Sequence, residues 1–80
     1  MHAATLRLDA PDPAAADAVR RALLVELADG PAGVVTRLRC EGSAILADVQ
    51  ADDLSGLRAA ITGLVRLGSA ALASLAPARV

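Results

Sequence analysis

Few side chains in this sequence are suited to catalysis, and they form no recognisable set. His2 is the only histidine, and its place at the N-terminus predicts a solvated side chain. Cys40 alternates with apolar neighbours, so we expect a buried structural thiol, since no histidine is available as its base. Asp52 and Asp53 are adjacent and diverge at a helix start, which favours capping over acid–base catalysis. With no metal-ligand spacing and no glycine-rich phosphate loop, we expect no catalytic residue, metal or cofactor.

The arginines are the more informative polar residues, and all eight basic residues are arginine. Arg58 and Arg66 are about 80° apart around a predicted helix and about 12 Å apart along it. They flank Thr62, and Ser55 and Ser69 complete a narrow polar edge. Arginine binds phosphate in a bidentate fashion, so this edge is either a contact for a phosphate backbone or a solvated edge that keeps the helix soluble.

A second group of charges lies on the outer face of the predicted sheet. It consists of Arg7, Arg37, Arg39, Asp9, Glu41 and Asp48. Opposite charges on neighbouring strands pair with one another, so we expect these residues to neutralise each other. The chain has no aromatic residue and a net charge of −1. It therefore offers no stacking platform for bases and no overall attraction to nucleic acid or anionic lipid.

Residues 52–76 are predicted to form one long helix, capped by Asp52 or Asp53 and ended by Pro77. One face is bulky and apolar: Leu54, Leu57, Ile61, Leu64, Val65, Leu72 and Leu75. A second face is mostly small: Gly56, Ala59, Ala60, Gly63, Leu67, Ala70 and Ala71. A helix that covers a small sheet needs one apolar face. The second face indicates close approach of another backbone, or simply an alanine-rich composition.

The remaining segments are predicted to form three strands and a shorter helix. Residues 3–9 alternate as a strand, and residues 34–41 and 44–51 form a hairpin around Gly42. Residues 13–29 form a helix that follows an Asp12 cap. Its core face is expected to hold Ala15, Val19, Ala22, Leu23 and Leu27. Leu24 and Val25 fall outside that face and leave further apolar surface unassigned.

The order of elements predicts a single α+β domain over residues 1–80, with the plan β-α-β-β-α. Both helices pack on one face of a three-stranded, antiparallel-type sheet. A right-handed crossover makes the first two strands parallel, and a central third strand gives the order one-three-two. The first strand is then an open edge, and Thr5 and Arg7 are the candidate residues for pairing with a second copy.

Length and composition indicate that the chain needs a partner. A chain of 80 residues has a marginal core, and the absence of aromatic side chains makes that core weaker. The single cysteine and the lack of a signal-peptide pattern favour a reducing cytoplasmic setting. Residues 59–76 are apolar enough to raise a membrane span, but Arg66 would lie in its middle, so we expect none.

Several phrases resemble a known family, the small dimerising subunit of the KEOPS complex, which also includes the cancer/testis-antigen-like proteins. They are the Glu41-Gly42 hairpin, the stretch ADDLSGLRAA over residues 51–60, and Leu64-Val65-Arg66-Leu67. The long first helix after Asp12-Pro13 also fits, so the resemblance covers nearly the whole chain.

The resemblance implies a non-enzymatic scaffold that forms a homodimer and docks its helices on the catalytic threonylcarbamoyltransferase-type subunit. It also implies help with tRNA binding for threonylcarbamoyladenosine (t6A) modification. We therefore expect partner-binding residues in the surplus apolar surface of both helices: Leu24, Val25, Ala60, Gly63 and Leu67. Arg58 and Arg66 become candidates for tRNA contact through the assembled complex.

Three other functions remain to be compared. A stand-alone nucleic-acid-binding module would need a basic surface and usually a GXXG loop, which the sequence lacks. A dimeric ligand-sensing module would need convergent polar groups at the dimer interface, and none can be named. An enzyme would need an acid, a base or a nucleophile in a set, which is missing.

Overall fold

A computed structural model describes residues 1–27, 30 and 32–75. The chain runs β1 (His2–Asp9), α1 (Pro13–Leu27), β2 (Val34–Glu41), β3 (Ala44–Ala51) and α2 (Leu54–Leu75). The α+β plan predicted from the sequence is confirmed, with strand bounds within one residue of those expected. The predicted ends of the two helices, at residues 28–29 and at Ala76-Pro77, lie outside the described residues.

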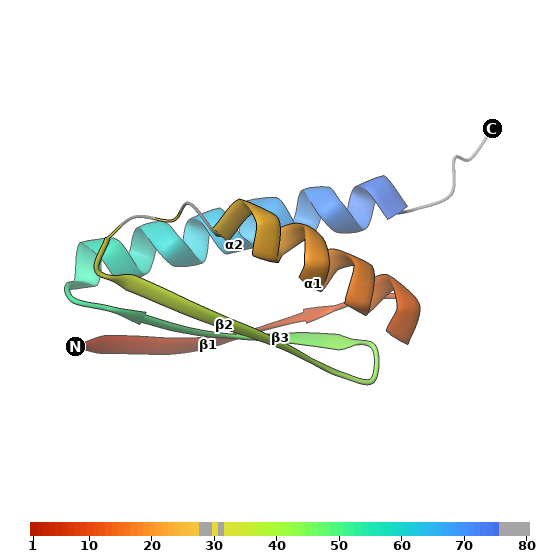
Figure 1. Cartoon of the computed structure of the whole chain (residues 1–80), viewed down its shortest axis with the longest axis horizontal. Coiled ribbons are helices and arrows are strands. Elements are labelled where there is room, and N and C mark those ends of the chain that lie inside the picture. The colour runs from red at the N-terminus through yellow and green to blue at the C-terminus, as the bar shows by residue number, and fades with distance from the viewer. Residues whose placement is uncertain (28–29, 31, 76–80) are drawn as a thin grey trace.

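The sheet has the strand order β1-β3-β2, and β3 pairs antiparallel with both neighbours. His2 and Val34 both stand opposite Ala51, so β1 and β2 run in the same direction on either side of β3. Figure 1 shows both helices on one face of this sheet. The predicted order and the parallel crossover are therefore confirmed, and β1 and β2 are the two edges.

Local signals explain where the elements begin and turn. The Asp12 carboxylate accepts a hydrogen bond from the Ala15 amide at 2.7 Å, and the Asp53 carboxylate accepts one from the Gly56 amide at 2.6 Å. These are N-cap contacts, so Asp53 rather than Asp52 caps α2. The β2–β3 hairpin turns through Gly42, whose φ of 58° is strained for residues other than glycine.

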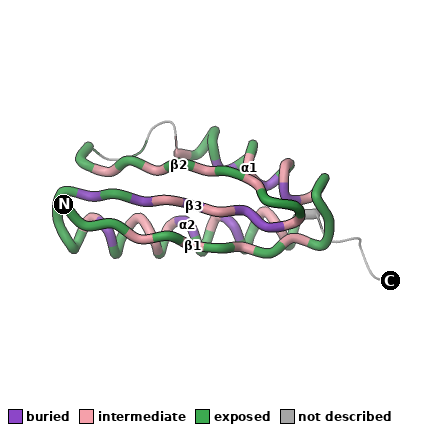
Figure 2. The backbone as a smooth tube through the Cα atoms, turned by 90° about the horizontal axis from the view of Figure 1, so that it is seen from below, coloured by how far each residue is buried: buried purple, intermediate pink, exposed green. Residues whose placement is uncertain are grey.

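The core lies between the sheet and the helices and is centred on β3. The largest fully buried side chains are Leu23, Ile45, Leu64, Val19 and Val49. Figure 2 shows buried residues along the central strand, whereas β1 and β2 alternate between half-buried and exposed positions. The alternation predicted for residues 3–9 is thus confirmed.

The core face predicted for α1 needs one correction. Ala16 is fully buried, whereas Ala22 is exposed. The buried line of α1 passes through Ala16, Val19 and Leu23, spaced by three and four residues. Ala22 lies about 100° around the helix from the centre of that line, so it faces solvent.

The face of α2 that meets the sheet also differs from the bulky face expected. Leu57 and Leu64 are buried, but Leu54 and Val65 are 46% and 44% exposed. Gly68 is buried instead, and a Cβ built on it would lie 2.5 Å from Cδ1 of Leu8 on β1. The absent side chain lets α2 approach β1 closely. This contact turns the helix so that part of its bulky face lies beside the core.

We predict that replacing two glycines of α2 by alanine changes the stability of the protein by different amounts. Gly63→Ala should raise the free energy of unfolding by about 0.5–1 kcal/mol, because alanine favours the helix. Among the residues that the structure describes, no atom outside the local helix lies within 4 Å of its Cβ position. Gly68→Ala should gain less or lose stability, because Leu8 must move. Urea unfolding measures both, and a Gly68→Ala protein as stable as Gly63→Ala would contradict this packing.

Candidate interaction surfaces

A groove of about 320 Å³ opens between the end of α1, the start of β2 and the near flank of α2. Its lining is mostly apolar and comprises Glu26, Leu27, Gly30, Val34, Thr36, Ala59, Ala60, Gly63, Leu64 and Leu67. A Cβ built on Gly63 would enter free space in this groove. By contrast, a Cβ on Gly56 would contact Val34, and one on Gly68 would contact Leu8. The groove therefore contains a helical glycine that the described part of the fold does not require.

The five residues predicted to bind a partner are divided by the structure. Ala60, Gly63 and Leu67 line the groove together. Ala60 and Leu67 are also half-buried against the chain's own core, so only part of each is open to a partner. Leu24 and Val25 lie on α1 outside the groove lining, where they are 43% and 74% exposed. The surplus apolar surface is therefore divided between the groove and the exposed side of α1.

The polar edge predicted on α2 is exposed along its length, at Ser55, Arg58, Thr62, Arg66 and Ser69. Over residues 1–27, 30 and 32–75, neither Arg58 nor Arg66 has a carboxylate within salt-bridge distance. An arginine without an internal partner keeps its full set of donors for a phosphate or carboxylate. These two guanidinium groups are therefore available to an anion.

The arginines of α1 are engaged within the chain. Asp17 pairs with Arg20 at 2.8 Å and with Arg21 at 2.9 Å. The hydrogen bond from Arg20 holds the pKa of the Asp17 carboxyl below its ordinary value, and attraction to Arg21 and Arg20 adds to this effect. The same hydrogen bond raises the pKa of Arg20. These contacts leave α2 as the helix with unpaired cations.

The edge strand β1 presents the two residues predicted to pair with a second copy. The Thr5 hydroxyl donates to the Asp48 carboxylate at 2.9 Å, and Arg7 pairs with Asp9 at 3.0 Å. Both side chains lie on the outer face of the sheet, so they leave the backbone edge of β1 open. The eight residues of β1 include no proline that would block pairing with another strand.

Sequence reasoning missed an apolar stripe on the far flank of α2. This α2 stripe consists of Leu54, Ile61, Val65 and Leu72, which are exposed or half-buried. It lies away from the groove, because the groove side of α2 carries Gly63 and Ala59. All four had been assigned to the bulky face of the helix; Ile61 and Leu72 do pack against the core, whereas Leu54 and Val65 are 46% and 44% exposed.

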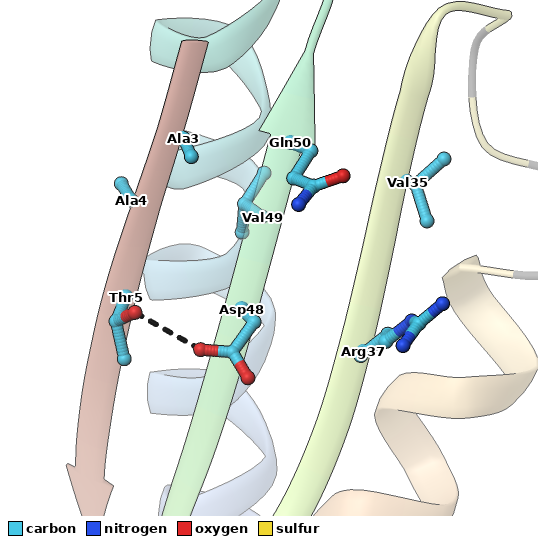
Figure 3. Close-up of a pocket in the computed structure, with 8 residues that line it drawn as sticks. All are labelled: Ala3, Ala4, Thr5, Val35, Arg37, Asp48, Val49 and Gln50. Atoms are coloured by element: carbon cyan, nitrogen blue, oxygen red, sulfur yellow. Dashed lines mark hydrogen bonds between the residues drawn. The ribbon is translucent and has the colours of Figure 1, made fainter. Parts of the chain in front are cut away.

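The outer face of the sheet carries a shallow hollow of about 330 Å³. Figure 3 shows Thr5 pointing to Asp48, while Arg37 on β2 extends away from that carboxylate. Asp48 also accepts from Arg39 at 3.2 Å, so the expected cross-strand charge pairing is only partly found. Of the polar residues that line the hollow, Thr5 and Asp48 bind each other, whereas Arg37 and Gln50 have no side-chain partner among the described residues.

Cys40 is half-buried on the inner face and packs beside Ile45, which fits a structural thiol. In the described part of the chain, no group of three His, Cys, Asp or Glu side chains is placed to hold a metal ion. No described helix has the length and hydropathy needed to cross a membrane. What the structure offers is two surfaces on opposite flanks of α2, separated by a polar edge.

The comparisons with known proteins identify the family of the chain. A family model described as "Transcription factor Pcc1" matches residues 3–76. Among curated proteins, none matches the chain closely enough to add a named relative. The match covers nearly all of the chain and includes both helices and all three strands. The chain therefore belongs to the Pcc1 family, the family of the small KEOPS subunit.

Proposed function

We propose that this chain is the non-catalytic scaffold subunit of a KEOPS complex in the cytoplasm. In this role it forms a homodimer, docks on the catalytic threonylcarbamoyltransferase-type subunit and helps to bind tRNA for t6A modification. Membership of the Pcc1 family supports the association with KEOPS. The individual contacts are our inference from the surfaces described above.

The observation that carries the docking proposal is the open position at Gly63. A glycine inside a helix costs about 1 kcal/mol relative to alanine. Gly56 and Gly68 have neighbours that a Cβ would press, but Gly63 has none among the described residues. A helix of the catalytic subunit that packs in the groove accounts for this glycine, because small residues allow helices to approach closely. Leu24 and Val25 extend the same contact along α1.

The homodimer uses the other flank of α2 in this proposal. The β1 edge is open, and Leu54 and Val65 are about half exposed beside it. The two flanks are separate, so a second copy and the catalytic subunit bind at the same time. Arg58 and Arg66 lie between the flanks, where they remain accessible to tRNA.

A stand-alone nucleic-acid-binding module is the second candidate, because the family description carries the words "transcription factor". Such a module binds nucleic acid without the catalytic subunit. A gel shift with the isolated protein separates the two functions, since the scaffold proposal expects weak binding or none. A ligand-sensing dimer has less support, since Thr5 and Asp48 in the hollow on the outer face bind each other.

Docking is tested by filling the groove at Gly63. Gly63→Leu should abolish co-purification with the catalytic subunit, because the new side chain occupies the space left for the partner helix. The fold should survive, because the side chain enters open space. Gly63→Ala is the matched control for helix propensity and should keep most of the binding. Circular dichroism checks folding, and a folded Gly63→Leu protein that binds at wild-type strength would refute the docking site.

Contact with tRNA is tested by removing both free guanidinium groups. Arg58→Ala with Arg66→Ala should weaken tRNA binding by the assembled complex and flatten its salt dependence, because two phosphate contacts are lost. Arg20→Ala with Arg21→Ala removes the same number of charges from α1 and should have a smaller effect. Unchanged affinity across a salt series for the Arg58/Arg66 variant would exclude this role.

A further inference from the structure

The edge of the sheet at β2 is a surface that the proposed function does not use. Among the described strands, β2 pairs only with β3, and its eight residues include no proline or glycine. The amide of Asp52 donates to the carbonyl of Gly33 at 3.0 Å, just before β2 begins. Backbone groups alternate in direction along a strand, so those of Thr36, Leu38 and Cys40 point away from β3. Within the described residues, no backbone hydrogen bond reaches them.

The helix α1 extends past this edge. Figure 2 shows α1 running beyond β2 on the side away from β3, and Figure 3 shows the end of α1 behind and beyond β2. Arg20 lies close to the Cys40 thiol of β2, and Leu24 follows Arg20 by one turn on the same flank. Glu26, on the other flank, lines the groove beside α2. The exposed part of Leu24 therefore lies over the open edge, about level with Leu38, because four helix residues and two strand residues both span about 6 Å.

Arg37 gives this edge a positive charge. It stands directly opposite Asp48 in the register of the sheet. Asp48, however, accepts hydrogen bonds from Thr5 and Arg39. In the described part of the chain, no carboxylate lies within salt-bridge distance of Arg37, and Figure 3 shows its side chain directed away from Asp48. Val35, on the same outer face, is 55% exposed. The edge thus combines an unneutralised cation with an apolar side chain.

We propose that an extended, acidic segment of a partner protein adds to β2 as a fourth strand, antiparallel to it and beneath α1. Residue 37 turns its backbone toward β3, so the segment residue opposite Arg37 lies in a non-hydrogen-bonded pair, with Cα atoms about 4.5 Å apart. An aspartate or glutamate at this position pairs with the guanidinium group. The preceding residue of the segment points inward beneath Leu24, and the second residue after the acid lies opposite Val35. The segment therefore has the pattern apolar-acidic-any-apolar.

A second copy of this chain is poorly suited to the same edge. Two β2 strands place Glu41 of the second copy opposite Arg37 only in the antiparallel register in which the two copies of Arg39 face each other. Like charges directly opposite one another on neighbouring strands are destabilising. The homodimer of the proposed function uses β1, so the β2 edge stays open in it. The charges therefore favour a segment of a different protein.

The charge pairing is tested with a labelled, end-blocked peptide of sequence TTTLETVT, whose glutamate is designed to stand opposite Arg37. Fluorescence anisotropy should show that the protein binds it, and glutamine in place of the glutamate should weaken binding by up to about fivefold. Arg37→Glu should reverse the preference, so that a peptide with lysine at this position binds more tightly than the glutamate peptide. Arg21→Glu, the matched control, makes the same charge change on α1 and should keep the preference for glutamate. Absence of binding to the unaltered protein, or an unchanged preference in Arg37→Glu, would overturn the proposal.

Strand addition is tested on the peptide backbone, which leaves the protein unaltered. Methylation of the leucine amide removes the hydrogen bond to Leu38 and should abolish binding. Methylation of the glutamate amide is the control and should be tolerated, because that amide points away from β2. In amide-exchange NMR, the peptide should slow exchange at Thr36, Leu38 and Cys40 and leave β1 unchanged. Equal effects of the two methylations, or protection outside β2 alone, would rule out strand addition.

A further comparison separates this edge from the groove. Leu24 borders both surfaces, so the comparison uses Gly63, which belongs to the groove alone. Gly63→Leu should bind the peptide as the unaltered protein does, whether or not it still binds the catalytic subunit. Loss of peptide binding in Gly63→Leu would place the peptide in the groove and refute the inference. Oligomers with protected β2 amides in the absence of peptide would assign the edge to a second copy, which also contradicts it.

Discussion

The close contact between Gly68 of α2 and Leu8 of β1 determines how the long helix presents itself. Because glycine has no side chain, the helix lies low over β1 at this point, and Leu57 and Leu64 face the sheet. With Leu57 and Leu64 facing the sheet, the helical geometry determines the directions of the other α2 side chains. One flank opens into the groove at Gly63, the other carries Leu54 and Val65, and the ridge between them carries Arg58 and Arg66.

Most of the fold could be predicted from the sequence because its signals are local. Alternation defines the strands, Gly42 marks the hairpin turn, and Asp12 and Asp53 cap the helices. The rotation of α2 could not be predicted in the same way. Its periodicity allowed a face centred on the bulky residues, and only the three-dimensional contact at Gly68 selects a different one. Ala60, Gly63 and Leu67 were grouped from the sequence and do line one groove, whereas the exposure of Leu54 and Val65 was missed.

The arginines show why composition alone understates what the surface can do. A net charge of −1 excludes general attraction to nucleic acid, but it does not describe how the charges are distributed. Asp17 engages Arg20 and Arg21, and the outer-sheet acids engage Arg7 and Arg39. The acidic side chains thus neutralise both arginines of α1 and two of the three on the sheet. Arg58 and Arg66 on α2 and Arg37 on the sheet have no carboxylate partner among the described residues.

The exposed apolar surface of α2 also helps to explain how so small a core is sufficient. In the part of the chain that the structure describes, ten buried apolar residues, four of them alanine, hold three strands and two helices, and the sequence has no aromatic side chain to contribute. Each residue buried at an interface adds apolar area that the isolated chain cannot bury, at about 25 cal/mol per Å². A scaffold that is fully stabilised only in its complex needs no large core of its own. In the complex that we propose, neighbouring subunits cover the exposed α2 stripe and the open groove and so complete the hydrophobic core.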